Sequence, residues 1–317
     1  MVLTMPNRSS IIYLGMNKLS PERRAQVISA LVEGNSIRAT CRMTGTAKGT
    51  VLKLLADIGE VCREYQDKHV RNLQTHRVQC DEIWSFCHAK EKNVPAENKG
   101  EFGYGDVWTW TAIDADSKLV ISWCIGGRDS YTGLAFVQDV ARRLAQRVQL
   151  TTDGHKAYLS AVERSFGENI DYAMLQKLYG SEPEQEVRYS PAICTGVKIE
   201  KVQGQPDPKH VSTSYVERQN LTMRMSMRRF TRLTNAFSKK VQNLGHAVAL
   251  HFLHYNFVRV HGTLGTTPAV AAGITDREWT IMDIVNLLES NRPTTCLTIG
   301  RTKRQRGRSF HGVRRRR

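Results

Sequence analysis

The sequence lacks the features that define several protein classes. Its seven cysteines are scattered singly, so no Cys-x-x-Cys pair is available for a zinc ribbon, and their odd number does not suggest a disulfide framework. No apolar run reaches the roughly 18 residues of a membrane span. The short apolar run at residues 11–14 is too brief for the core of a signal peptide. We therefore expect reduced thiols, no zinc and no membrane contact, in a cytoplasmic protein.

Negative charge is also scarce. The 317 residues include 46 Lys and Arg against 30 Asp and Glu, a formal net charge of +16. The apolar fraction of 40% is that of an ordinary globular protein and excludes a disordered one. A surface this basic attracts polyanions, of which nucleic acid is the commonest, although ribosomal and membrane-surface proteins carry similar charge. The charge therefore favours a nucleic-acid partner and a place on the nucleoid.

Three short helices are predicted near the start of the chain. Ser20 before Pro21 is a typical helix start, and the glycines at positions 34 and 45 are typical helix stops. Apolar residues recur at helical spacing between these points. The third helix has an apolar inner side and a polar outer side, which is the pattern of a helix-turn-helix unit. The alternative is a three-helix packing unit with solvated lysines. The outer residues predicted to contact DNA are Lys48, Thr50 and Lys53.

The pattern changes to the two-residue period of strands after residue 76. Three consecutive strands are predicted within residues 77–125, then a helix that begins near Ser130, then a strand at residues 148–152. This is the opening order of a ribonuclease-H-like α/β fold, with a mixed sheet flanked by helices. The Gly-, Pro- and Gln-rich residues 167–212 give no clear assignment. Two long helices are predicted beyond them, at about residues 214–230 and 240–260.

These patterns divide the chain into five parts. We expect an extension without structure at residues 1–15, the helix-turn-helix domain at 16–60 and a charged helical linker at 61–76. The catalytic domain is expected at residues 77–275. The C-terminal segment, 276–317, ends in a basic tail with nine Arg or Lys and no acidic residue after position 300.

Three carboxylates are candidates for a metal site. Asp81 lies in the first predicted strand, Asp153 directly after the fourth, and Glu217 early in the first long helix. Each has a simpler interpretation: a strand-edge acid for Asp81, a hairpin turn for Asp153 with its following glycine, and a solvated helix residue for Glu217. Glu82 is an alternative ligand, but strand alternation puts it with the aromatic residues on the core face. Phosphoryl transfer needs little more than two Mg²⁺ ions on such oxygen ligands.

The helix around Glu217 is unusually basic. Residues 218–240 contain seven Lys or Arg and no acid, and Glu217 shares its predicted helix face with polar and basic residues at spacings of three and four. One carboxylate on a basic face suits a helix that lies along a DNA backbone with a metal ligand at one end. The residues predicted to contact DNA here are Asn220, Arg224, Arg228, Lys239 and Lys240.

Several sequence blocks occur in a characteristic order. They are Gln79–Phe86, Thr152–Gly154 with Tyr158, Val216–Asn220, Arg228–Lys240 and His254–Ala269. In this order they resemble the motif blocks of the Asp-Asp-Glu transposases, and among those the insertion sequence one family, over about residues 75–273. Members of that family often carry an N-terminal zinc finger, which no cysteine spacing here supports.

The resemblance implies a ribonuclease-H-like catalytic domain whose triad is Asp81, Asp153 and Glu217. It implies two Mg²⁺ ions, with Mn²⁺ as a substitute, bridged by Asp81 and held one each by the other two acids. The implied activity is cleavage at the ends of a mobile element and strand transfer into target DNA, by a homodimer or larger assembly on double-stranded DNA. Two rivals remain: a nuclease or integrase of the same superfamily, and a non-enzymatic helix-turn-helix regulator derived from a transposase.

Overall fold

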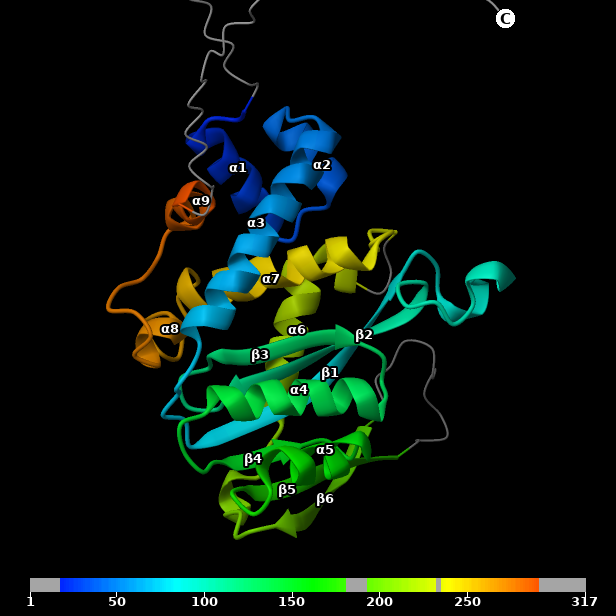
Figure 1. Ribbon diagram of the computed structural model, residues 1–317, viewed down its shortest axis with the longest axis vertical. Coiled ribbons are helices and arrows are strands. Elements are labelled where there is room, and N and C mark those ends of the chain that lie inside the picture. Colours follow the sequence, from blue (N-terminus) through cyan, green and yellow to red (C-terminus); the bar gives the residue numbers. More distant parts are fainter. Residues whose placement is uncertain (1–17, 181–192, 232–234, 291–317) are drawn as a thin grey trace, which may run out of the picture.

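The computed structural model describes residues 18–180, 193–231 and 235–290 (Figure 1). The expected extension at residues 1–15 and the basic tail after residue 300 lie outside these ranges. The described part joins a helical N-terminal region to a six-stranded sheet with helices on both faces. Within it, no helix is both long enough and apolar enough to cross a lipid bilayer.

The N-terminal region folds as the predicted set of three helices. These are α1 (Pro21–Val32), α2 (Ile37–Thr44) and α3 (Lys48–His69). The Ser20 hydroxyl accepts a hydrogen bond from the backbone N–H of Arg23 at 3.3 Å and thereby caps α1. Gly45 ends α2 with a left-handed backbone, φ 64°.

Helix α3 is longer than the sequence predicts. It continues without a break to His69, so most of the expected linker at residues 61–76 is the second half of one helix. Its buried side chains continue past Leu55 through Ile58 and Cys62, and this inner side packs along α7 (Val241–Phe257). Gly59 lies against the backbone of His246 in α7, where a larger residue would not fit. The helix therefore connects the N-terminal region rigidly to the rest of the protein.

The sheet confirms the predicted ribonuclease-H-like α/β arrangement. Its strand order is β3-β2-β1-β4-β5-β6, with an antiparallel β1–β2–β3 meander, β4 parallel to β1, β5 parallel to β4, and β6 antiparallel to β5. The last two strands lie within residues 167–212, which the sequence left unassigned. The strands are β1 (Arg77–Cys87), β2 (Gly105–Asp114), β3 (Val120–Gly126), β4 (Gln149–Thr152), β5 (Asp171–Gly180) and β6 (Ile193–Gln203).

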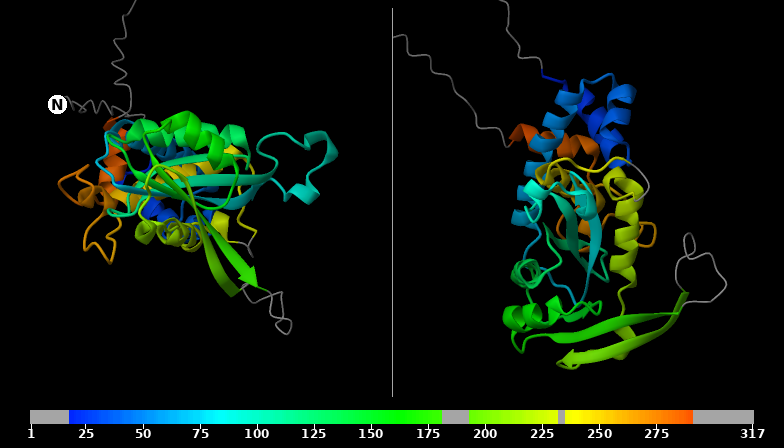
Figure 2. Two further views of the ribbon diagram at one scale, coloured as in Figure 1. Left: turned by 90° about the horizontal axis from the view of Figure 1, so that it is seen from below. Right: turned by 90° about the vertical axis from the view of Figure 1, so that its right-hand side faces the viewer.

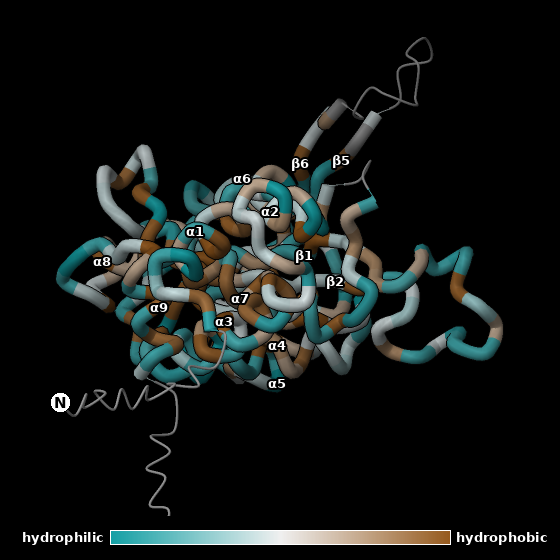
Figure 3. The backbone as a smooth tube through the Cα atoms, turned by 90° about the horizontal axis from the view of Figure 1, so that it is seen from above, coloured by the Kyte–Doolittle hydropathy of each residue, from teal (hydrophilic) through white to brown (hydrophobic). Residues whose placement is uncertain are grey.

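Helices cover both faces of the sheet. In Figure 2 (right), α4 and α5 lie on one face and α6 crosses the other. The segment between β1 and β2, which contains the short turns η1 (Glu91–Asn93) and η2 (Ala96–Asn98), projects from the body, as does the β5–β6 hairpin (Figure 3). The remaining helices are α4 (Ser130–Arg143), α5 (Ala157–Phe166), α6 (Ser214–Ser226), α8 (Pro268–Ala271) and α9 (Ile281–Ser290).

One apolar core runs through the N-terminal helices and the sheet. The buried cluster includes Val27 of α1, Ile58 of α3, Ile83 of β1, Phe252 of α7 and Ile284 of α9. The chain beyond the sheet therefore returns to pack α9 against α1 and α3, and an ion pair joins Arg24 to Glu289 at that contact.

The core contains a histidine that must stay neutral. His251 of α7 is 3% exposed, and neither ring nitrogen has a hydrogen-bond partner among the described residues. Burial, with smaller contributions from His254 and Arg259, lowers the pKa of His251 to about 3, and burial lowers that of His254 to about 4. In the unfolded chain both titrate near their ordinary value, so their contribution to stability is present above about pH 6.5 and is lost as the pH falls towards these lowered values.

We expect His251→Phe to reduce the acid sensitivity of the fold. Between about pH 7 and pH 5 the wild type should lose about 2 kcal/mol of unfolding free energy through His251, and the variant should lose that much less. Urea unfolding of both proteins at the two pH values measures the difference. Equal losses in the two proteins would show that His251 is protonated without cost in the folded state.

Candidate active site

Strand pairing brings two of the three predicted carboxylates together. Asp81 lies in the middle of β1, and its neighbour Cys80 pairs with Thr152, the last residue of β4. Asp153 follows Thr152 directly, so its carboxylate lies beside that of Asp81. The turn after it leads into α5, which excludes the hairpin alternative for Asp153.

Glu217 reaches the same place from helix α6, which packs on the face of the sheet that carries the Asp81 side chain. Helix α6 packs on β1, and Gln79 of β1 fixes its start, because the Gln79 Oε1 accepts hydrogen bonds from the backbone N–H groups of Tyr215 and Val216 at 2.9 and 3.2 Å. Glu217 lies in the first turn. The three acids line one open pocket of about 710 Å³, together with Arg128, His155, Lys156 and Lys177.

Hydrogen bonds hold the Asp81 carboxylate in place, while burial and neighbouring acids disfavour its charged form. The Asn220 side-chain amide donates to Oδ2 and the backbone N–H of Glu82 donates to Oδ1, each at 2.8 Å. Burial raises the pKa of Asp81 to about 7, with further contributions from Asp153 and Glu217. A cation beside Asp81 would relieve this cost, which is the property expected of a metal ligand.

The Asp153 side chain is 31% exposed. Its Oδ1 accepts a hydrogen bond from the backbone N–H of His155 at 3.0 Å, and its Oδ2 lies 3.5 Å from Nη2 of Arg128. Arg128, in the loop between β3 and α4, also stacks 4.7 Å above the Trp108 ring. The sequence did not single out Arg128, although Gly126-Gly127 directly before it marks the end of β3.

Glu217 is paired with a lysine in this structure. Lys177 of β5 makes an ion pair with it, and the Thr213 hydroxyl donates to its Oε1 at 2.6 Å. Lys177 was missed because it falls in a strand that the sequence left unassigned. Lys177 therefore occupies a position where a cation is electrostatically favoured. Glu217 lies outside the close group of oxygens to which Asp81 and Asp153 belong.

The tightest carboxylate group differs from the predicted triad. Asp81, Glu82 and Asp153 each offer an oxygen, and the three oxygens lie within 4.8 Å of one another. Glu82 is on the core face, as strand alternation predicts, yet its carboxylate belongs to this group. Burial raises the pKa of Glu82 to about 8, helped by Asp153 and Asp81. Oxygen ligands in this arrangement suit Mg²⁺ or Mn²⁺.

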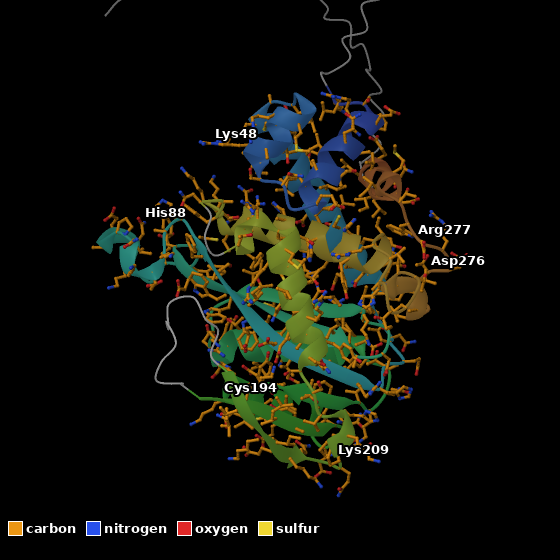
Figure 4. All side chains as sticks on the ribbon, turned by 180° about the vertical axis from the view of Figure 1, so that it is seen from behind. Lys48, His88, Cys194, Lys209, Asp276 and Arg277 are labelled. Carbon is orange, nitrogen blue, oxygen red and sulfur yellow. The ribbon has the colours of Figure 1, made fainter. Side chains whose placement is uncertain are left out.

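The residues predicted to contact DNA fall into different environments. Lys48, Thr50 and Lys53 are exposed at the start of α3, where Lys53 also pairs with Asp57 at 3.2 Å. In Figure 4, Lys48 lies towards the same side of the molecule as His88 and Cys194, which mark the two projecting segments. Lys239 and Lys240 are exposed just before α7.

The basic face predicted around Glu217 needs two corrections. Helix α6 ends at Ser226, and Met227 is extended (φ −130°, ψ 104°), so Arg228 lies in the separate turn η4 (Arg228–Phe230) and does not continue the face of Glu217 and Arg224. Asn220, predicted to contact DNA, is 5% exposed and donates to Asp81. It therefore positions a carboxylate.

Comparison with known proteins gives structural likenesses only. No protein-family model and no curated protein matches the sequence. A cryo-EM structure of a piggyBac transposase synaptic complex with hairpin DNA matches with a TM-score of 0.37 at 11% identity, over 85% of this chain and 70% of that chain. The Mos1 mariner paired-end complex with Mn matches with a TM-score of 0.21 at 12% identity, over 49% of this chain and 60% of that chain. The Mos1 strand transfer complex gives 0.23 at 12%, over 75% and 78%. The function proposed below rests on the carboxylate site and on no likeness of this size.

Proposed function

We propose that the protein is a DNA transposase of the Asp-Asp-Glu type, which cuts DNA at the ends of a mobile element and joins them to target DNA. The observation that carries the proposal is the convergence of Asp81, Asp153 and Glu217 on one pocket from β1, the end of β4 and α6. Divalent ions bound there supply a nucleophilic water and neutralise charge on the reacting phosphate.

The protein's own residues prepare this site for a phosphodiester. Asn220 and the Glu82 backbone hold the Asp81 carboxylate in one orientation, and Gln79 fixes the helix that carries Glu217. Arg128, His155, Lys156 and Lys177 surround the acids, so the rim of the pocket can bind phosphate oxygens while the acidic centre cannot. Such a rim orients the strand at the reacting centre.

The exposed residues on one side of the molecule suit a DNA duplex. Lys48 at the start of α3 and the segments marked by His88 and Cys194 lie towards that side (Figure 4). The net charge of +16 favours DNA along such a path, and two element ends handled together require a dimer or larger assembly on DNA in the cytoplasm. The same centre in a nuclease or integrase would cut DNA without moving the gene.

The test uses DNA from the two flanks of the gene. If they carry inverted repeats, duplexes that end in those repeats should be cleaved by the full-length protein in Mg²⁺ to give a 3′-hydroxyl, and the cleaved end should join to plasmid DNA. EDTA should abolish both products. Binding without cleavage would favour the non-enzymatic regulator, and cleavage without joining would favour the nuclease.

We expect the start of α3 to recognise the element ends. Replacing Lys48, Thr50 and Lys53 with alanine should lower the preference for end duplexes over random duplexes by about tenfold or more, because each base contact contributes roughly 1–3 kcal/mol. Fluorescence anisotropy with both duplexes at one salt concentration measures this. Lys68→Ala, an exposed lysine near the other end of α3, is the control and should leave the preference unchanged. An unchanged preference in the triple variant would remove α3 from recognition.

A further inference from the structure

Glu82 is a buried acid whose charge is poorly compensated. Its side chain is fully buried, and neither carboxylate oxygen makes a hydrogen bond of normal geometry to the described residues. The buried Tyr158 hydroxyl is close enough to oppose the rise in the Glu82 pKa, but burial outweighs it. A buried carboxylate without compensation is costly, so its presence beside Asp81 needs a physical reason.

Two neighbouring side chains compensate Glu82 only in part: the Arg128 cation, and His155, whose pKa is lowered by burial so that its ring is neutral near pH 7. Nη2 of Arg128 lies 3.6 Å from its Oε2, and Nδ1 of His155 lies 3.7 Å from its Oε1, both longer than a charge-assisted hydrogen bond. Arg128 is 40% exposed and at a similar distance, 3.5 Å, from Asp153. The guanidinium is thus shared between two acids and bonded closely to neither.

The position of Glu82 is that of a ligand. Its oxygen lies within 4.8 Å of oxygens from both Asp81 and Asp153, whereas Glu217 is paired with Lys177 on the other side of the pocket. Alternation along β1 sends Asp81 and Glu82 to opposite faces, and Asp153, beyond the end of β4, lies within reach of both.

We propose that Glu82 is a fourth carboxylate of the centre and that one divalent ion binds among Asp81, Glu82 and Asp153, leaving Glu217 to serve a second ion. This inference rests on the proposed metal-dependent function. The first ion then belongs to the buried group, whereas an ion at Glu217 has to displace Lys177, which pairs with Glu217 in this structure.

Calorimetric titration with Mn²⁺ in the absence of DNA tests the proposal. We expect Glu82→Gln to weaken Mn²⁺ binding by about tenfold or more, and Glu217→Gln to change it by less than about threefold. Arg128→Met separates ligation from simple pairing. If Glu82 served only to hold Arg128, removal of Arg128 would weaken Mn²⁺ binding as Glu82→Gln does. If Glu82 is a ligand, Arg128 is a cation that competes with the metal, and Arg128→Met should leave Mn²⁺ binding equal or tighter.

The outcomes distinguish this inference from the proposed function. No Mn²⁺ binding by the wild type, or binding indifferent to Asp81→Asn, would contradict the metal centre itself. Loss in Asp81→Asn with Glu82→Gln within about threefold of wild type would overturn the role of Glu82 alone. Should Glu82→Gln fail to fold, anomalous scattering from Mn²⁺ in wild-type crystals decides: a peak about 2.0–2.3 Å from a Glu82 oxygen supports the proposal, and a peak bonded to Asp81 and Asp153 but not to Glu82 overturns it.

Discussion

Asp81→Asn, Asp153→Asn and Glu217→Gln are each expected to lower DNA cleavage by roughly three orders of magnitude or more, because loss of an anionic ligand removes several kcal/mol of transition-state stabilisation. The amides have the same shape as the acids, so folding and DNA affinity should be retained. Single-turnover cleavage at saturating protein, beside anisotropy binding, separates the two properties. Glu200→Gln, an exposed acid of β6 outside the pocket, is the matched control.

The same series has a stability signature. The folded protein raises the pKa of Asp81 to about 7, so ionisation of Asp81 opposes folding. The free energy of unfolding should therefore fall as the pH rises from the pKa of Asp81 in the unfolded chain to about 7. At higher pH and without metal, Asp81→Asn should therefore melt at a higher temperature than the wild type. A lower melting temperature together with lost cleavage would mean that the substitution disrupts the fold and does not act only on metal binding. Near-normal cleavage in Mg²⁺ would remove that residue from the triad.

Gly59→Ala is expected to destabilise the protein by about 3 kcal/mol, a large effect for one methyl group. The added carbon would lie 2.5 Å from Cβ of His246 and 2.6 Å from its Cα. The backbone of α7 cannot move aside as a flexible side chain would, so α3 must separate from α7. Gly49→Ala in the same helix is the control, since nothing lies within 4 Å of the added methyl, and it should be neutral or slightly stabilising.

Denaturant unfolding of the two variants measures this difference. Helix α3 carries the proposed DNA-reading residues at one end and packs on α7 near the other, so Gly59→Ala should also reduce cleavage of end duplexes more than cleavage of random DNA. Equal stability of the two variants would show that α3 and α7 are not in close contact in solution.

Some parts of this structure were predictable from apolar periodicity alone. Apolar residues recur at strand spacing in residues 78–86 and at helical spacing in residues 241–257, which form β1 and α7, although each element is buried on more than the one face that its spacing indicates. Strand β6 shows why residues 193–203 were harder. Its alternating Val197 and Ile199 are 52% and 47% exposed, so apolar character there does not report a core.

Residue type suggests the three candidate carboxylates, but local pattern alone does not place them relative to one another. Strand alternation gives the face of Glu82 but cannot show that Asp153, just past a strand end, meets acids from both faces. Helical periodicity likewise places Arg228 on the same helix face as Glu217, but α6 ends at Ser226 and Met227 separates it from Arg228. Both features depend on tertiary arrangement, which the local sequence does not determine.

The most direct test replaces one non-bridging oxygen of the scissile phosphate with sulfur. If ions held by the carboxylate centre contact that phosphate, sulfur at the contacted position should slow cleavage by about tenfold or more in Mg²⁺, which prefers oxygen, and Mn²⁺ should restore it. Equal rates in Mg²⁺ for the oxygen substrate and for both sulfur stereoisomers would mean that no ion contacts the reacting phosphate, and would contradict a metal-dependent Asp81–Asp153–Glu217 centre.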